Sequence, residues 1–282
     1  MKRELKTLMD GLTFGEGPRW YGNKFYFSDF YSHKVYSLDL KGNYEVIVEV
    51  PNQPSGLGWM PDGTMLIVSM KDRKLLSFKD DSIKEEADLS ELAGFHCNDM
   101  VVDHSGNAYI GNFGFNTYAG EEIKPTNLIL VKPGEDPVIA ADELLFPNGT
   151  VITPDGNTLI IAETFAGTLT AYDIDAEGDL NNRREWAQLG GGALPDGICL
   201  DAENGVWVAS PTTNECVRVL EGSKITHRIK IDRSAFACMI GGNRLFVCSS
   251  KKSDPVACAR ARDARIEVFP VPFTAAGYPL SE

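Results

Sequence analysis

The sequence has no long apolar run: no stretch of the 282 residues approaches the roughly 18 that a membrane-spanning helix needs. Its N-terminal segment carries basic residues with no apolar run behind them, so no signal peptide is predicted. Acidic residues outnumber basic ones and give a formal net charge of −13. That charge would repel nucleic acid and anionic membranes, and neither is expected as a partner.

Paired cysteines are also missing. The six cysteines include no CxxC pair, and most of them lie within apolar runs. Reduced, buried thiols in a cytoplasmic protein are the simplest interpretation, and a structural zinc site held by cysteines is not expected.

Helical periodicity is nearly absent, and residues 90–96 (SELAGFH) come nearest to it. Short β-rich runs appear instead, separated by turn dipeptides. These dipeptides lie between apolar runs at Asp62-Gly63, Ser105-Gly106, Asp155-Gly156, Asn204-Gly205 and Gly242-Asn243. A hairpin signal that recurs along the chain predicts an all-β fold.

Alignment of these hairpins reveals six repeats, each of which begins with a short motif. The motifs are GEGPRW (15–20), PSGLGW (54–59), CNDMVV (97–102), PNGTVI (147–152), PDGICL (195–200) and AFACMI (235–240). Taking one equivalent residue in each as its anchor gives Glu16, Ser55, Asn98, Asn148, Asp196 and Phe236. Repeats of this length with about four strands predict a six-bladed β-propeller of four-stranded antiparallel blades, as one domain over residues 1–282.

The two ends of the chain offer a way to close the ring. Residues 3–10 precede the first anchor, and residues 264–271 (ARIEVFPV) end the last blade. We expect the N-terminal strand to complete the sheet of the last blade, which would limit exposed sheet edges. A β-sandwich or two smaller β domains are the alternative, but no linker or break in composition supports a boundary.

Anchors at the start of the innermost strands would meet at one mouth of the central channel. Four of the six carry hard oxygen donors: Glu16, Asn98, Asn148 and Asp196. Asn-Gly and Asp-Gly are common turn formers, so the signal is their recurrence at one place in the repeat. Such hard donors suit Ca²⁺, Mg²⁺ or Mn²⁺ better than zinc or copper. We expect one divalent cation, Ca²⁺ first, with Mg²⁺, Mn²⁺ or Zn²⁺ as alternatives.

Four of the motifs, GEGP (15–18), CND (97–99), PNG (147–149) and PDG (195–197), resemble the senescence marker protein/gluconolactonase/luciferin-regenerating enzyme family over essentially the full chain. The resemblance implies a six-bladed propeller with one catalytic divalent metal, and many members hydrolyse sugar lactones. It implies Glu16, Asn148 and Asp196 as metal ligands. It gives Asn98 a place beside the metal or on the substrate, and Asp196 the role of general base.

One departure concerns the substrate. Sugar lactonases often have arginine where this chain has His96, which puts a sugar-acid lactone in doubt. The ends of the second strands suggest an apolar, aromatic rim, made of Tyr31, Met70, Phe113, Phe115, Thr164, Phe165 and Pro211. His96 and Asn98 are further candidates for contact with the substrate.

The expected reaction is metal-assisted hydrolysis of a lactone or related ester, with a small molecule as partner and a monomer or homodimer as assembly. Asp196 would accept the proton of the attacking water. A water at the ion, deprotonated through Asp196 or His96, is an equal alternative. The rival functions are a phosphotriesterase, another metal-dependent enzyme acting on a carbonyl compound, and a non-enzymatic calcium-binding scaffold.

Overall fold

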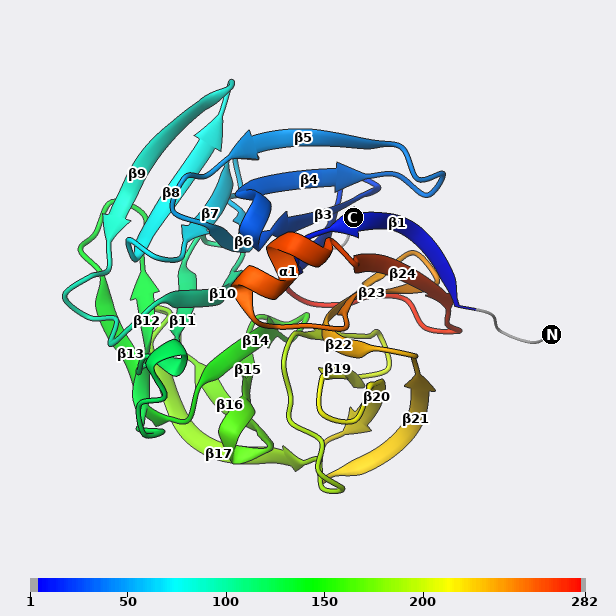
Figure 1. Ribbon diagram of the computed structural model, residues 1–282. Helices are drawn as coiled ribbons and strands as arrows, with labels where there is room; N and C mark the ends of the chain where they lie inside the picture. The colour runs from blue at the N-terminus through cyan, green and yellow to red at the C-terminus, as the bar shows by residue number, and fades with distance from the viewer. Residues whose placement is uncertain (1–4, 280–282) are drawn as a thin grey trace.

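Six four-stranded antiparallel sheets stand around a common axis in the computed structural model, which describes residues 5–279 (Figure 1). The first three blades are β2 (Gly15–Tyr21), β3 (Lys24–Asp29), β4 (Lys34–Leu38) and β5 (Tyr44–Glu49); β6 (Pro54–Trp59), β7 (Met65–Ser69), β8 (Lys74–Lys79) and β9 (Ser82–Asp88); and β10 (Cys97–Val102), β11 (Ala108–Asn112), β12 (Thr126–Val131) and β13 (Val138–Leu144). The prediction of a six-bladed propeller is confirmed.

The last three blades follow the same order. They are β14 (Pro147–Ile152), β15 (Thr158–Glu163), β16 (Thr168–Ile174) and β17 (Leu180–Gln188); β18 (Ile198–Leu200), β19 (Val206–Ser210), β20 (Glu215–Leu220) and β21 (Lys224–Lys230); and β22 (Ser234–Gly241), β23 (Arg244–Ser250), β24 (Ala264–Pro270) and β1 (Lys6–Leu12). The first strands of neighbouring blades contact each other around the ring, so they are the innermost.

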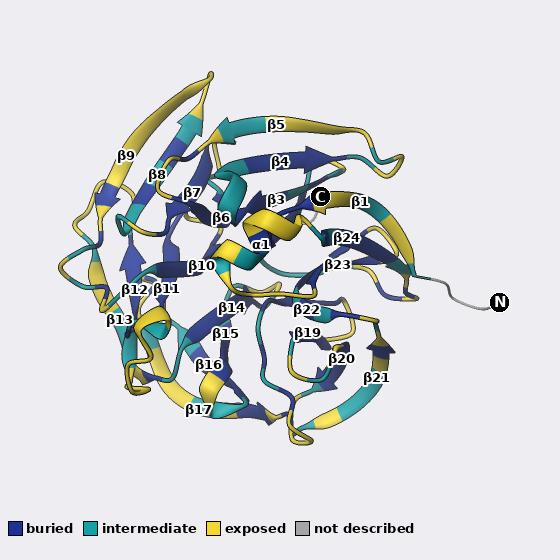
Figure 2. Cartoon of the chain, in the orientation of Figure 1, coloured by how far each residue is buried: buried dark blue, intermediate teal, exposed yellow. Residues whose placement is uncertain are grey.

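Burial falls from the axis outward (Figure 2). The inner strands β10 and β14 are buried at every position, whereas the outer strand β9 is exposed at all positions but one. Apolar side chains therefore pack between the blades. The anchors at the start of the inner strands are held on a rigid frame.

The ring closes through its N-terminal strand, as predicted. β1 pairs with β24 in an antiparallel register that sets Thr7 opposite Glu267. Of the segment 3–10 that was expected to make this strand, residues 3 and 4 lie outside the described residues. The sheet of the last blade thus joins both ends of the chain.

The segment nearest to helical periodicity does not mark the α-helix of the structure. Residues 90–96 form turns, and an α-helix lies instead at α1 (Pro255–Ala261), in the connection between β23 and β24. Two signals mark its start: Asp254 accepts a hydrogen bond from the Ala257 amide at 2.8 Å, and Pro255 occupies the first turn. The helix is too short for a periodic pattern to reveal it.

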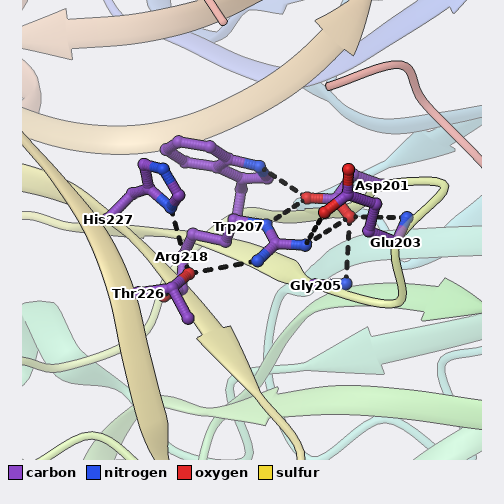
Figure 3. A network of polar contacts seen from close by, with 7 residues as sticks. All are labelled: Asp201, Glu203, Gly205, Trp207, Arg218, Thr226 and His227. Atoms are coloured by element: carbon purple, nitrogen blue, oxygen red, sulfur yellow. Dashed lines mark hydrogen bonds and ion pairs between the residues drawn. The ribbon is translucent and has the colours of Figure 1, made fainter. Parts of the chain in front are cut away.

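A buried polar network fixes the fifth blade at the far end of the inner strands (Figure 3). The Asp201 carboxylate accepts hydrogen bonds from Arg218 Nε at 2.6 Å and from Trp207 Nε1 at 3.0 Å. The Arg218 guanidinium also lies 4.2 Å from the ring centroid of Phe273. Because Phe273 belongs to the segment after β24, this network holds that segment against the end of the ring opposite the anchors.

The cysteines agree with the expectation of free thiols, since all six are unpaired and buried. None of the helices within residues 5–279 is long and apolar enough to cross a membrane. The same residues contain no group of three or more His, Cys, Asp or Glu side chains placed to hold a metal. A cation site in this part of the chain would therefore have to use amide oxygens as well.

Candidate metal and substrate site

The four oxygen-bearing anchors meet in one cavity of about 590 Å³ at the mouth of the channel. Glu16, Asn98, Asn148 and Asp196 all line it. They come from the starts of β2, β10 and β14 and from the residue pair before β18. Of the other two anchors, Phe236 lines the cavity, whereas Ser55 is buried and does not. The convergence expected from the repeat is thus present in the fold.

A local irregularity of the inner strands accounts for the direction of the anchors. The register between the first and second strands shifts just after the anchor, for example between Glu16 and Arg19 and between Pro147 and Thr150. Similar shifts occur in blades 2, 3 and 6. A bulge at this point takes the anchor out of the regular ladder and re-aims its side chain.

The glycine that follows most anchors has a steric reason. A Cβ on Gly149 would lie 2.4 Å from the backbone nitrogen of Ile198 in the next blade, closer than any Cβ can approach. Gly17 combines such a contact, 2.6 Å from the Ser55 carbonyl oxygen, with a φ of +55°. The glycines of the motifs therefore let the inner strands close tightly enough to gather the anchors.

Burial disfavours the charged form of both carboxylates of the ring. Burial, followed by the charges of Asp196 and Asp99, raises the pKa of Glu16 well above its usual value. Burial also raises the pKa of Asp196 to about 8, against a hydrogen bond from Asn148 that lowers it. Two carboxylates held close in a desolvated site call for a cation to balance them.

Asn148 is already oriented for such a cation. Its Nδ2 donates to Thr164 Oγ1 at 3.2 Å, and Thr164 Oγ1 donates in turn to the Pro195 carbonyl at 2.8 Å. The two hydrogens of Nδ2 serve Thr164 and the Asp196 carboxylate, which leaves the amide oxygen as the atom available as a ligand. Two carboxylates and two amide oxygens fit a hard divalent cation such as Ca²⁺, whose remaining positions water or substrate would fill.

Aromatic rings form most of the cavity wall. Phe14, Phe30 and Phe236 lie at blades 1 and 6, and the Phe14 and Phe236 centroids are 4.6 Å apart. Phe113 and Phe146 lie at blades 3 and 4, where they stack with centroids 4.5 Å apart. Since blades 1 and 6 stand opposite blades 4 and 3 in a six-bladed ring, the two groups face each other across the ligand ring.

Of the residues predicted at the rim, Tyr31, Phe113, Thr164 and Phe165 line the cavity, and four other candidates do not. Met70 is 0% exposed because it packs behind the wall with Phe14, Phe30 and Phe113. Phe115 is 3% exposed and packs against Phe146 and Phe165. Pro211 and His96 are also absent from the lining. Met70, Phe115 and Pro211 are therefore corrected to wall support or positions outside the cavity.

His96 lies just outside the cavity, stacked on Phe95 with 4.0 Å between the ring centroids. The rings of Phe113 and Tyr118, both of which line the cavity, lie 6.1 and 5.9 Å from it. Burial, and then the charges of Lys71 and Arg73, lower the pKa of His96 to about 4. The ring is therefore neutral near pH 7, and its catalytic role stays a prediction.

Sequence reasoning missed several lining residues: Phe14, Phe30, Thr117, Tyr118, Phe146, Ser253, Asp254 and Pro255. A signal for two of them was present. Phe14 and Phe146 stand two residues before their anchors, at the place that His96 occupies in its own repeat. Alignment of that position would have found them. Tyr118, Ser253 and Asp254 belong to long connections that do not repeat, and so no such signal existed.

Fold and site together define a class: a six-bladed propeller with an oxygen-lined ring at the base of an aromatic cavity. The family described as "SMP-30/Gluconolactonase/LRE-like region" matches residues 14–251, and the chain belongs to this family. The resemblance inferred from the four motifs is therefore confirmed.

Individual relatives are distant. The chain is 25% identical to regucalcin from Gallus gallus over 248 residues, which cover 83% of this chain and 81% of the relative. It is 27% identical to diisopropyl-fluorophosphatase from Loligo vulgaris over 200 residues, 63% of each chain.

Solved structures agree on the fold. A luciferin-regenerating enzyme matches with a TM-score of 0.83 at 16% identity, covering 99% of this chain and 100% of that one. Regucalcin from Agrobacterium tumefaciens, described as a calcium-binding protein, matches with a TM-score of 0.82 at 21% identity, covering 99% and 98%. At these identities the likeness establishes the shared architecture alone.

Proposed function

We propose that this protein is a metal-dependent hydrolase that opens a lactone or cleaves a related ester with an apolar or aromatic body. The observation that carries the proposal is the meeting of Glu16, Asn98, Asn148 and Asp196 at the base of a cavity walled by aromatic rings. Family membership supports a hydrolase, because gluconolactonases give the family part of its name. Ca²⁺ is the first choice of cation.

When bound, the cation supplies a Lewis acid for the ester carbonyl. Glu16 and Asn148 hold the ligand ring in shape, and Asn98 lies where its amide reaches either the cation or the substrate. Asp196 accepts the proton of the attacking water. A cation lowers the basicity of a carboxylate bound to it. Asp196 therefore acts best while its second oxygen faces the water.

The wall serves the same reaction. Phe14, Phe113 and Phe146 exclude bulk water from the base of the cavity, which strengthens every electrostatic interaction there. Facing aromatic groups would also grip a flat apolar substrate. A hydroxyl-rich sugar lactone fits such a wall poorly.

A panel of sugar lactones, aromatic lactones, aryl esters and phosphotriesters tests the proposal. We expect turnover of aromatic lactones or aryl esters that EDTA abolishes and Ca²⁺ restores, and that Asp196→Asn eliminates. Full turnover after thorough chelation would overturn the proposal. Metal-dependent turnover of phosphotriesters alone would favour the second candidate, a phosphotriesterase, which the similarity to diisopropyl-fluorophosphatase supports. Metal binding without turnover of any compound would favour a calcium-binding scaffold.

A further inference from the structure

Three connections from different blades meet over the aromatic wall. Tyr31 comes from the 3-10 helix η1 (Phe30–Ser32) of blade 1, and Tyr118 comes from η2 (Thr117–Ala119) of blade 3. Ser253 and Asp254 come from the connection of blade 6 that leads into α1, and Pro255 is the first residue of that helix. All five line the cavity, and in Figure 1 α1 lies over the middle of the ring. Ser253 and Asp254 are exposed whereas Phe113 is buried, so this outer end of the cavity carries polar groups.

The Tyr31 hydroxyl ties these connections together. It donates to the backbone carbonyl of Ser253 at 3.3 Å, which uses its single hydrogen. Burial raises the pKa of the neighbouring Tyr118, and an interaction with the Tyr31 hydroxyl opposes that rise. Towards a ligand, the Tyr31 hydroxyl therefore acts as a hydrogen-bond acceptor through its lone pairs.

The charges of the lining residues also favour a ligand that donates hydrogen bonds. Among the described lining residues there are three carboxylates and no Lys, Arg or His. Glu16 and Asp196 belong to the ligand ring, which leaves Asp254 as the charge at the outer end. One oxygen of Asp254 caps α1 through the Ala257 amide at 2.8 Å, and a carboxylate has capacity for further acceptance.

Cations near this end do not change the conclusion. Lys251 and Lys252 precede Asp254 in the same connection, and all three are exposed, but of the three only Asp254 lines the cavity. The formal charge of the whole protein is −13. An anionic group entering the mouth would meet a carboxylate and no lining cation to pair with.

We propose that Tyr31, Tyr118 and Asp254 form a distal subsite that selects substrates whose far end carries a hydrogen-bond donor, an ammonium or hydroxyl group, and rejects those with an anionic far end. This inference rests on the proposed function, because it assumes that the reacting carbonyl sits at the ligand ring. A preferred substrate then has three parts in order: the carbonyl, an apolar or aromatic body, and a donor at the opposite end.

Binding can be tested without turnover. Aryl methyl ketones that carry aminomethyl, hydroxymethyl or carboxylate at the para position keep the carbonyl and resist hydrolysis. Calorimetry on the Ca²⁺-loaded protein should give a Kd about 10-fold lower for the aminomethyl ketone than for the carboxylate. Asp254→Asn should shrink that ratio to about 2-fold, because asparagine keeps the helix cap but removes the charge.

Two further variants complete the test. Tyr118→Phe should weaken binding of the hydroxymethyl ketone about 3-fold relative to an unsubstituted ketone. Glu221→Gln removes an exposed carboxylate from the turn after β20 and should leave every ratio unchanged. A ratio that Asp254→Asn does not move, or the absence of measurable binding by all three ketones at millimolar concentration, would overturn the subsite.

The matched para-substituted phenyl acetates separate this inference from the proposed function. If the wild-type protein hydrolyses none of them while the ketone ratios respond to Asp254→Asn, the hydrolase proposal fails and the subsite stands. If the acetates are hydrolysed and the aminomethyl and carboxylate forms have equal kcat/KM, the subsite fails and the hydrolase proposal stands.

Discussion

Arg19 and Asp99 form a buried ion pair across three inner strands, with 2.5 Å between Nη2 and Oδ1. The same guanidinium donates to the backbone carbonyls of Leu57 in β6 at 2.8 Å and of Met100 in β10 at 2.5 Å. Asp99 follows the anchor Asn98 directly, and Arg19 lies three residues after Glu16. The pair therefore joins blades 1, 2 and 3 immediately beside the ligand ring.

Replacing Arg19 of this ion pair should lower the stability of the protein. Arg19→Met leaves the Asp99 carboxylate buried without its partner, so we expect the free energy of unfolding to fall by about 3–5 kcal/mol in urea titrations. The double variant Arg19→Met/Asp99→Leu should regain much of that loss, since it leaves no unpaired charge. A single-variant loss below about 1 kcal/mol would show that water reaches Asp99.

Cation binding should depend on pH in a direction set by the ring carboxylates. The pKa of Asp196 is about 8 in the folded protein, above the unfolded value of about 3.9. Between these values the folded cation-free protein keeps a proton that the unfolded chain has lost, so its stability falls as pH rises through the window. A cation must displace that proton, and its binding therefore tightens as pH rises.

The measurement is the shift in Tm caused by millimolar Ca²⁺. We expect a larger shift at pH 8 than at pH 6, and a lower Tm for the EDTA-treated protein at pH 8 than at pH 6. Equal shifts at the two pH values would contradict the coupling between proton and cation.

Glu16→Gln should separate stability from cation binding. It removes one of the two ring carboxylates, and burial followed by the charge of Asp196 raises the pKa of Glu16. The EDTA-treated variant should therefore have a higher Tm than wild type at pH 8, whereas its Ca²⁺ affinity should fall at least about 10-fold. Glu221→Gln is the matched control and should change neither quantity. A variant less stable than wild type without cation would argue against repulsion in the ring.

The repeat made the architecture and the ring predictable. The repeat predicts that four anchors lie close together, because equivalent positions in a closed ring face one axis. These anchors are Glu16, Asn98, Asn148 and Asp196. That argument needs only the spacing of the motifs, and the structure shows the same residues around one cavity. Closure of the ring by the N-terminal strand was predicted by a separate argument, namely that a closed ring limits exposed sheet edges.

The wall was predictable only where it repeats. Second-strand ends gave Tyr31, Phe113 and Phe165 correctly, but the same logic placed Met70 and Phe115 on the rim, where packing turns them into the core. Side chains that follow a strand leave its alternating pattern, so their direction depends on the turn. The outer subsite is beyond sequence reasoning, since Tyr118 and Asp254 come from connections that differ from blade to blade.

The last prediction tests the catalytic role that the sequence suggested for His96. Its Nδ1 is buried and has no hydrogen-bond partner within the described part of the chain, and its pKa is lowered to about 4. A group that is neutral from pH 5 upward cannot set a limb of the rate profile there. We therefore expect the profile of kcat against pH between 5 and 9 to keep its shape in His96→Gln, with any loss appearing in KM. A limb near pH 6 to 7 that vanishes in His96→Gln would instead establish the imidazole as an acid or base. His104→Gln is the control for the loss of one titrating ring, because it replaces an exposed histidine in the turn between β10 and β11.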